Sequence, residues 1–180
     1  EIFIQKSQQG GGSPMIRGFS TNRLLYTVDG VRMNSAIFRS GNLQNVISLD
    51  ANAIERTEVL FGPGSTLYGS DAIGGVMNFQ TLTPHLSFNE RKQINSRIMS
   101  RYSSANNEFT NHAQLSVGWK KWATVTSLTH SHFGDLKMGQ HGPDEYLRTF
   151  YVNSENGADQ VIINDRPLVQ RPTGYSQTNI

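Results

Sequence analysis

Three histidines in the second half of the chain have a spacing that could bind a metal or haem. His130 and His132 alternate along a predicted strand, so their imidazoles share one face, and His141 follows in the next loop. Imidazole nitrogen is a common ligand for metals and for haem iron. The chain has no cysteine to complete such a site. The pattern therefore favours ordinary loop histidines, with capture of a metal or haem as the alternative.

Two stretches of the sequence resemble parts of enzyme active sites but lack essential residues. Gly62 to Thr66 has the glycines of a phosphate-binding loop but not the Gly-Lys-Ser/Thr ending that holds phosphates and magnesium. Ser70-Asp71, with any histidine, does not make the nucleophile elbow of a hydrolase. We therefore predict no enzyme activity, no catalytic residue, no metal site and no cofactor.

The composition excludes further classes of function. Lys and Arg number 16 against 14 Asp and Glu, a net charge of +2, so no strong field favours nucleic acid. The absence of cysteine excludes disulfides and thiolate chemistry. No run of about 18 apolar residues exists, so a chain of this kind would span a membrane only with strands.

The segments that must position these residues change in character near Pro84. Before it, glycines interrupt short apolar runs, which is typical of short strands and one-turn helices in a mixed α+β domain. Asp29-Gly30 predicts a tight turn, and Asp50 or Ser48 could cap a brief helix through Ala51 and Ala53. The predicted strands here span residues 24–28, 31–33, 54–60 and 76–79.

After Pro84 the alternating runs are longer. An apolar row alternates with a polar row between residues 112 and 119. The apolar row is Ala113, Leu115, Val117 and Trp119, and the polar row is His112, Gln114, Ser116 and Gly118. We predict strands over residues 94–102, 109–119 and 122–128 and from about residue 175, and irregular structure over 134–172.

Trp119 and Trp122 flank the two-residue connection Lys120-Lys121. In a transmembrane barrel, tryptophans occupy the interfacial layer, and the short turns lie opposite the long loops. The alternative is a soluble hairpin, which the pair taken alone favours.

Three ordered motifs carry a family resemblance. Residues 54–78 read IERTEVLFGPGSTLYGSDAIGGVMN, preceded by Ile16-Arg17-Gly18 and by residues 28–34, VDGVRMN. Together they resemble the plug domain of TonB-dependent outer-membrane receptors, over residues 3–79. The residues after 84 resemble barrel strands only by their alternation and by residues 173–177.

The resemblance implies an α+β plug, a small mixed β-sheet with short helices, followed by antiparallel transmembrane strands of a 22-stranded barrel. We expect a plug over residues 1–83, a linker over 84–92, and the first three to four barrel strands with extracellular loops over 93–180. The segment that contacts TonB in such receptors would precede this chain. Glycines such as Gly62, Gly64 and Gly69 would shape turns or allow close approach to the barrel wall.

The resemblance also suggests a latch between plug and barrel. Arg17 matches a family arginine that pairs with barrel carboxylates, for which the planar guanidinium fork is suited. Glu55, Arg56 and Glu58 could extend the latch, or form the solvated face of a strand. Many members carry a basic residue before the Gly-Pro pair, where this chain has Phe61, so a paired-arginine latch is not expected.

The remaining expectations concern ligand and location. Residues near the plug apex could contact ligand, or form an ordinary polar loop; they are Arg32, Asn34, Phe38, Arg39 and Asn42. The expected function is import across the outer membrane of a scarce ligand, a ferric siderophore or haem, with cobalamin possible. The expected partners are TonB, the ligand and outer-membrane lipid, without nucleic acid. The alternative is a soluble or surface β-rich module that binds glycan or protein.

Overall fold

The computed structural model describes residues 2–20, 23–33, 49–89, 91–155, 158–169 and 172–180. The chain divides into two compact units, one of residues 1–99, 112–129 and 178–180, the other of residues 100–111 and 130–177. In the part of the chain that is described, no helix has the length and apolar character needed to cross a membrane.

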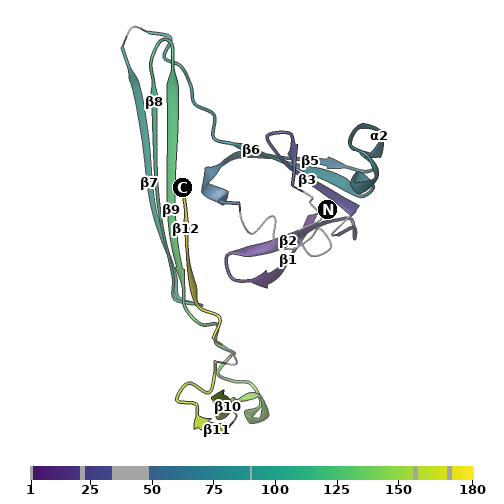
Figure 1. Ribbon diagram of the computed structural model, residues 1–180, viewed down its shortest axis with the longest axis vertical. Coiled ribbons are helices and arrows are strands. Elements are labelled where there is room, and N and C mark those ends of the chain that lie inside the picture. The colour runs from purple at the N-terminus through teal and green to yellow at the C-terminus, as the bar shows by residue number, and fades with distance from the viewer. Residues whose placement is uncertain (1, 21–22, 34–48, 90, 156–157, 170–171) are drawn as a thin grey trace. The chain divides into compact units, whose positions relative to one another are not determined.

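A mixed four-stranded sheet organises the first 83 residues (Figure 1). The order is β4-β3-β6-β5, in which β3 and β6 are parallel and the two outer pairs are antiparallel. The bounds are β3 Leu24–Val28, β4 Val31–Arg32, β5 Ile54–Phe61 and β6 Gly75–Thr81. The predicted small mixed sheet is therefore confirmed, and each of its strands lies at the predicted place.

Short elements cover both faces of this sheet. On one face, the hairpin of β1 (Ile2–Gln8) and β2 (Gly11–Ile16) packs Ile16 against Tyr26 and Phe79. The Tyr26 hydroxyl donates to the Pro14 carbonyl at 3.1 Å. On the other face, helix α2 (Ser65–Tyr68) and the 3-10 helix η4 (Ser70–Ala72) cover Leu25 and Val76. Alternation along each strand sends neighbouring residues into two separate apolar cores.

The predicted turn and cap have the geometry that their residues favour. Asp29 and Gly30 have φ of 49° and 81°, as in a two-residue hairpin turn of type I′. The Asp50 carboxylate accepts a hydrogen bond from Asn52 N at 2.9 Å and caps the 3-10 helix η3 (Ala51–Ala53). Residue 48, the other predicted cap, lies outside the described residues.

Three long strands and one short strand form an antiparallel sheet in the order β12-β9-β8-β7 (Figure 1). The strands are β7 Gln93–Ser103, β8 Glu108–Gly118, β9 Ala123–Phe133 and β12 Tyr175–Asn179. Three of them have 11 residues, which matches the length that a tilted transmembrane strand needs. They contribute to both compact units.

Side-chain contacts assign the two faces of this sheet. Thr110 Oγ1 donates to Ser131 Oγ at 3.0 Å, and His112 Nδ1 lies 2.8 Å from Thr129 Oγ1, so these four share one face. Leu115, two positions from Ala113, lies on the other face and is 48% exposed. The predicted separation of a polar row from an apolar row is thus present, as in a strand between a wet lumen and lipid.

The prediction of irregular structure over residues 134–172 was wrong in part. They contain the 3-10 helix η5 (Asp144–Tyr146) and an antiparallel hairpin of β10 (Phe150–Glu155) and β11 (Ala158–Ile163). The signal for this hairpin was the Asn156-Gly157 pair between aromatic and β-branched residues, a strong turn pattern. The β1–β2 hairpin was missed as well, because its glycines obscured the strand pattern.

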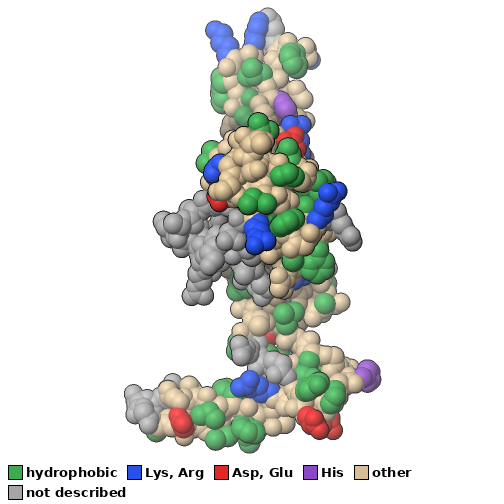
Figure 2. All heavy atoms as spheres, turned by 90° about the vertical axis from the view of Figure 1, so that its right-hand side faces the viewer, with side chains coloured by type: hydrophobic (Ala, Val, Ile, Leu, Met, Phe, Trp, Pro, Cys, Tyr) green, Lys and Arg blue, Asp and Glu red, His purple; other side chains and the backbone are tan. Residues whose placement is uncertain are grey.

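Apolar side chains on the β10–β11 hairpin remain exposed, as the green side chains in the lower part of Figure 2 show. The most exposed of them are Phe150, Val152, Val161 and Ile163. In the paired register, Phe150 lies opposite Ile163 and Val152 opposite Val161, so the four share one face.

Candidate functional site

Arg17 occupies a strained turn at the end of β2. Ile16 and Phe19 exchange two backbone hydrogen bonds of 2.9 and 3.0 Å, which leaves Arg17 and Gly18 as a two-residue loop. Both have positive φ, 49° and 82°. A non-glycine residue in this region is held against a cost of about 1–3 kcal/mol, and such strain often accompanies a functional role.

The guanidinium of Arg17 lies over the ring of Phe61, with Cζ 5.5 Å from the ring centroid. Phe61 ends β5 on the same side of the sheet as Val59, which packs on the core that contains Ile16. The turn that follows buried Ile16 therefore carries Arg17 over the phenylalanine. This distance fits a cation–π interaction.

Arg56 and Glu58 come together on the opposite side of β5. Arg56 Nη2 lies 3.0 Å from Glu58 Oε1, and Arg56 Nε donates to Gln80 Oε1 at 2.6 Å. Asn78 Nδ2 donates to Glu58 Oε2 at 3.4 Å, and Thr27 Oγ1 donates to Asn78 Oδ1 at 2.7 Å. The structure thus links two of the predicted latch residues with each other and places Arg17 elsewhere.

Glu55 and Asp29 hold the segment that follows β6. The Asp29 carboxylate accepts from Thr81 Oγ1 at 2.7 Å and from Thr81 N at 2.9 Å, and Glu55 Oε2 accepts from Thr83 N at 3.1 Å. Leu82 N donates to the Ala53 carbonyl at 3.1 Å. Three successive backbone N–H groups therefore have partners. We name residues 81–83 with Asp29 and Glu55 the exit clasp.

The exit clasp lowers the pKa of both carboxyl groups. Hydrogen bonds from the side chain and then the backbone of Thr81 hold the pKa of Asp29 below its ordinary value. Thr83 does the same to the pKa of Glu55, with smaller contributions from His85 and Arg56. In both cases the donated hydrogen bonds favour the charged form.

The predicted apex residues are only partly described. Arg32 Nη2 donates to the Tyr68 carbonyl, at the end of helix α2. Asn34, Phe38, Arg39 and Asn42 lie outside the described residues. Arg32 is consequently the one member of this predicted group with a known position.

Comparison with known proteins finds relatives of the first half of the chain. A family profile for the TonB-dependent Receptor Plug Domain matches residues 2–76. The vitamin B12 transporter BtuB of Vibrio vulnificus is 47% identical over 88 residues, which is 47% of this chain and 14% of that protein. The heme/hemopexin utilization protein C of Haemophilus influenzae is 36% identical over 94 residues, 52% of this chain and 13% of that protein. Residues 2–76 thus match the plug domain of TonB-dependent receptors, and this part of the chain is similar to outer-membrane transporters of that family.

A solved structure extends the likeness in fold beyond the plug. The copper transporter OprC superposes with a TM-score of 0.58 at 18% identity, over 74% of this chain and 20% of OprC. At this identity the likeness concerns fold alone. The chain aligns with less than a fifth of the length of the two curated relatives named above.

The three predicted histidines lie apart in the described part of the chain. His130 and His132 alternate on β9 and are exposed on one face, as expected, and His132 Nδ1 lies 2.9 Å from Ser176 Oγ. His141 is exposed in the loop before η5. Within the described ranges, no three His, Asp or Glu side chains are grouped to hold a metal ion.

Trp119 and Trp122 stack across the β8–β9 turn. Their ring centroids are 3.7 Å apart with an interplanar angle of 16°, and Trp119 N donates to the Trp122 carbonyl at 2.8 Å. Trp122 is 56% exposed. The pair is therefore not enclosed in a soluble core.

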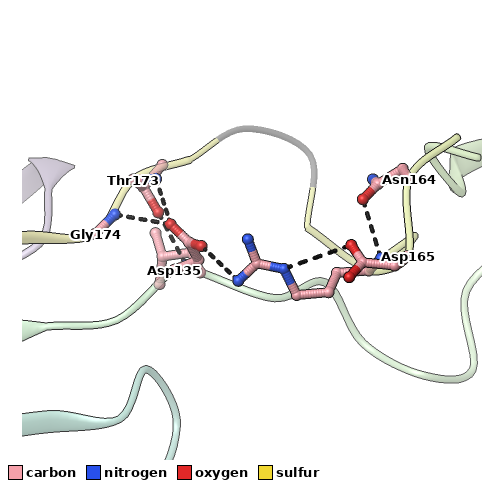
Figure 3. A network of polar contacts seen from close by, with 7 residues as sticks. Asp135, Asn164, Asp165, Thr173 and Gly174 are labelled. Atoms are coloured by element: carbon pink, nitrogen blue, oxygen red, sulfur yellow. Dashed lines mark hydrogen bonds and ion pairs between the residues drawn. The ribbon is translucent and has the colours of Figure 1, made fainter. Parts of the chain in front are cut away.

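Asp135 is a residue that sequence reasoning missed. Its carboxylate accepts from Thr173 N at 2.8 Å and Gly174 N at 2.9 Å, and pairs with Arg166 Nη1 at 3.1 Å (Figure 3). Hydrogen bonds from Gly174 and Thr173 lower the pKa of Asp135, which stands outside the strands. The ion pair joins the two ends of the long loop, and no local pattern signals partners more than 30 positions away.

Proposed function

We propose that the receptor imports a scarce ligand, a ferric siderophore or haem, with cobalamin as the alternative cargo. The plug match over residues 2–76 carries this proposal, because a plug domain serves to close the pore of an importing receptor. The named relatives transport vitamin B12 or use haem and hemopexin, which supports cargo of this kind.

In the proposed cycle, ligand binds on the outer side and TonB then displaces the plug. The sheet of β7, β8, β9 and β12 forms part of the barrel wall, with the polar face toward the lumen and the apolar face toward outer-membrane lipid. Trp119 and Trp122 lie at the membrane interface beside the short turn. TonB is the proposed partner that supplies the energy for this step.

One group of plug residues has a restraining role in this proposal. Arg17, Glu55, Arg56 and Glu58 restrain the plug in the barrel. Because Arg56 already pairs with Glu58, and Glu55 already accepts from Thr83, Arg17 is the member best placed to bind a carboxylate outside the plug. We therefore expect Arg17→Ala to loosen the plug more than Arg56→Ala.

Ligand contacts are proposed at the apex and in the long loop. The apex group comprises Arg32, Asn34, Phe38, Arg39 and Asn42, and the second group comprises His141 in the long loop with His130 and His132 at the adjoining end of β9. Because His130 and His132 alternate with Thr129 and Ser131, they lie on the face opposite the lumen side, so in this proposal they meet ligand only above the membrane. A soluble glycan- or protein-binding module would leave the plug motifs of residues 16–18, 28–34 and 54–78 without a purpose, so we do not favour it.

An uptake assay tests the proposal directly. Cells that express the full receptor would be given labelled haem, a ferric siderophore or cobalamin, in strains with and without TonB. We expect accumulation of one of these compounds that requires both the receptor and TonB. Equal uptake without TonB, or no uptake of any of the three, would refute active import of this cargo class.

A further inference from the structure

We propose that Phe61 is a positioning residue for Arg17: its ring holds the guanidinium so that the N–H edge faces a carboxylate outside the plug. This proposal rests on the proposed restraining role of Arg17. It gives a purpose to the one position at which the chain departs from the basic residue expected before Gly62-Pro63.

The contact between Arg17 and Phe61 can restrain the guanidinium and still leave its N–H donors available. Arg17 Cζ lies over the face of the Phe61 ring, 5.5 Å from its centroid, and both side chains remain exposed at the end of the sheet. The N–H groups of a guanidinium are the donors that bind a carboxylate bidentately. A ring offers no carboxylate or carbonyl acceptor, so Phe61 restrains Arg17 without taking up the donors used for recognition.

The turn restricts the arginine further. Arg17 stands at φ 49° between two backbone hydrogen bonds, so its Cα–Cβ direction is set by the hairpin and not by a flexible loop. A long side chain still loses up to about 2 kcal/mol of rotamer freedom when it binds. The ring reduces this loss because it already restricts the side chain before the partner arrives.

The partner is argued from charge. In the described part of the chain, no Asp or Glu side chain lies within ion-pair distance of Arg17. A second cation at position 61 would repel Arg17, whereas a neutral ring attracts it. The site therefore holds one cation with its edge free, which suits a single carboxylate from the receptor's own wall or from the cargo.

The test uses the full receptor in outer-membrane vesicles and hydrogen exchange of the amides of residues 13–20. Phe61→Leu keeps apolar bulk but removes the aromatic face, whereas Phe61→Tyr keeps the face. We expect Phe61→Leu to speed exchange by about two- to fivefold, as an exposed cation–π contact predicts, and Phe61→Tyr to behave like the natural receptor. Phe88→Leu, at a fully exposed phenylalanine, is the matched control.

A double variant separates positioning from simple packing. Added to Arg17→Ala, Phe61→Leu should cause no further change. The same increment in both backgrounds, or no effect of Phe61→Leu in the natural background, would overturn the positioning role. The uptake assay reports import separately, so import can stand while this inference fails.

Two cargo arms identify the source of the carboxylate. The exchange is repeated with haem, which carries carboxylates, and with cobalamin, which carries amides in their place. An effect of Phe61→Leu before any cargo is added assigns the carboxylate to the receptor itself. An effect that arises only with haem assigns it to the cargo, and both results support the positioning role.

Discussion

At the residue scale, the plug depends on a few positions where no other residue type fits. Gly74 is buried and donates its N–H to the Arg23 carbonyl at 2.8 Å. A Cβ there would lie 2.4 Å from Phe19 Cβ and 3.1 Å from Arg23 O. The close approach is to the plug's own chain, so this glycine serves packing inside the plug.

We expect Gly74→Ala to destabilise the plug by about 1–3 kcal/mol, because the added methyl group forces the β2–β3 connection away from the sheet. Hydrogen exchange of the β3 and β6 amides in the full receptor measures the effect. Gly139→Ala is the control, since a Cβ at Gly139 meets nothing within 4 Å. Equal protection in both variants would contradict this account.

The Phe61 position shows the limit of residue-scale reasoning from a pattern. By family pattern, Phe61 is only a missing cation. In the structure it is an aromatic surface 44 positions from Arg17 in the chain that contacts its guanidinium. The substitution thus changes how Arg17 is held, and a paired-arginine latch is not required to explain it.

At the element scale, the exit clasp ties β6 to the β3–β4 turn and to β5. The pKa of Asp29 and the pKa of Glu55 are both lowered in the folded chain. Groups of this kind stabilise the fold fully above their ordinary pKa, and the contribution is lost as pH falls through the lowered pKa.

We therefore expect exchange at the amides of residues 81–83 to rise as pH falls below about 4, the ordinary range of carboxyl groups. Exchange rates corrected for intrinsic pH dependence, measured on the full receptor, provide the readout. Asp29→Asn with Glu55→Gln should abolish the extra acid sensitivity. If the double variant responds to acid like the natural protein, the clasp does not control this segment.

The long loop is a second element held by a carboxylate. We expect Asp135→Asn to speed protease cleavage within residues 136–172, because Thr173 N, Gly174 N and Arg166 lose a charged acceptor. Limited proteolysis of the receptor in outer-membrane vesicles measures the rate of this cleavage. Asp165→Asn is the control, since Asp165 is exposed and its pair with Arg166 Nε is long, at 4.0 Å. Comparable cleavage of the two variants would show that Asp135 does not hold the loop.

At the scale of the whole molecule, the four-stranded sheet separates a polar face from an apolar one. Glu108 pairs with Arg101 on the face that carries Thr110 and His112. Phe133 and Tyr175 also stack on that side, with ring centroids 4.8 Å apart. The opposite face leaves side chains such as Ile98 exposed, as lipid contact would require.

This arrangement predicts opposite outcomes for two neighbouring substitutions on β8. Leu115→Arg places a charge on the apolar face and should cost about 2–4 kcal/mol near the bilayer midplane. Gln114→Arg places the same charge on the polar face and should be tolerated. Outer-membrane abundance and resistance to heat-induced unfolding in detergent distinguish them. Equal behaviour would show that this sheet does not face lipid.

The sequence by itself determined the local and periodic features of the protein. Alternation predicted the strand faces of β8, and Asp29-Gly30 and Asp50 predicted a turn and a cap that the structure contains. The ordered motifs predicted the plug family. These features depend on neighbouring residues, whose steric and hydrogen-bonding preferences act within a few positions.

Only the tertiary structure decided which distant residues meet. Arg17 lies on Phe61, Asp29 binds Thr81 across 52 positions, and Asp135 joins the ends of a long loop. Such partners meet when strands pair, apolar cores pack and a long loop closes on itself. Because that choice depends on the whole set of contacts, no short stretch of sequence contains it.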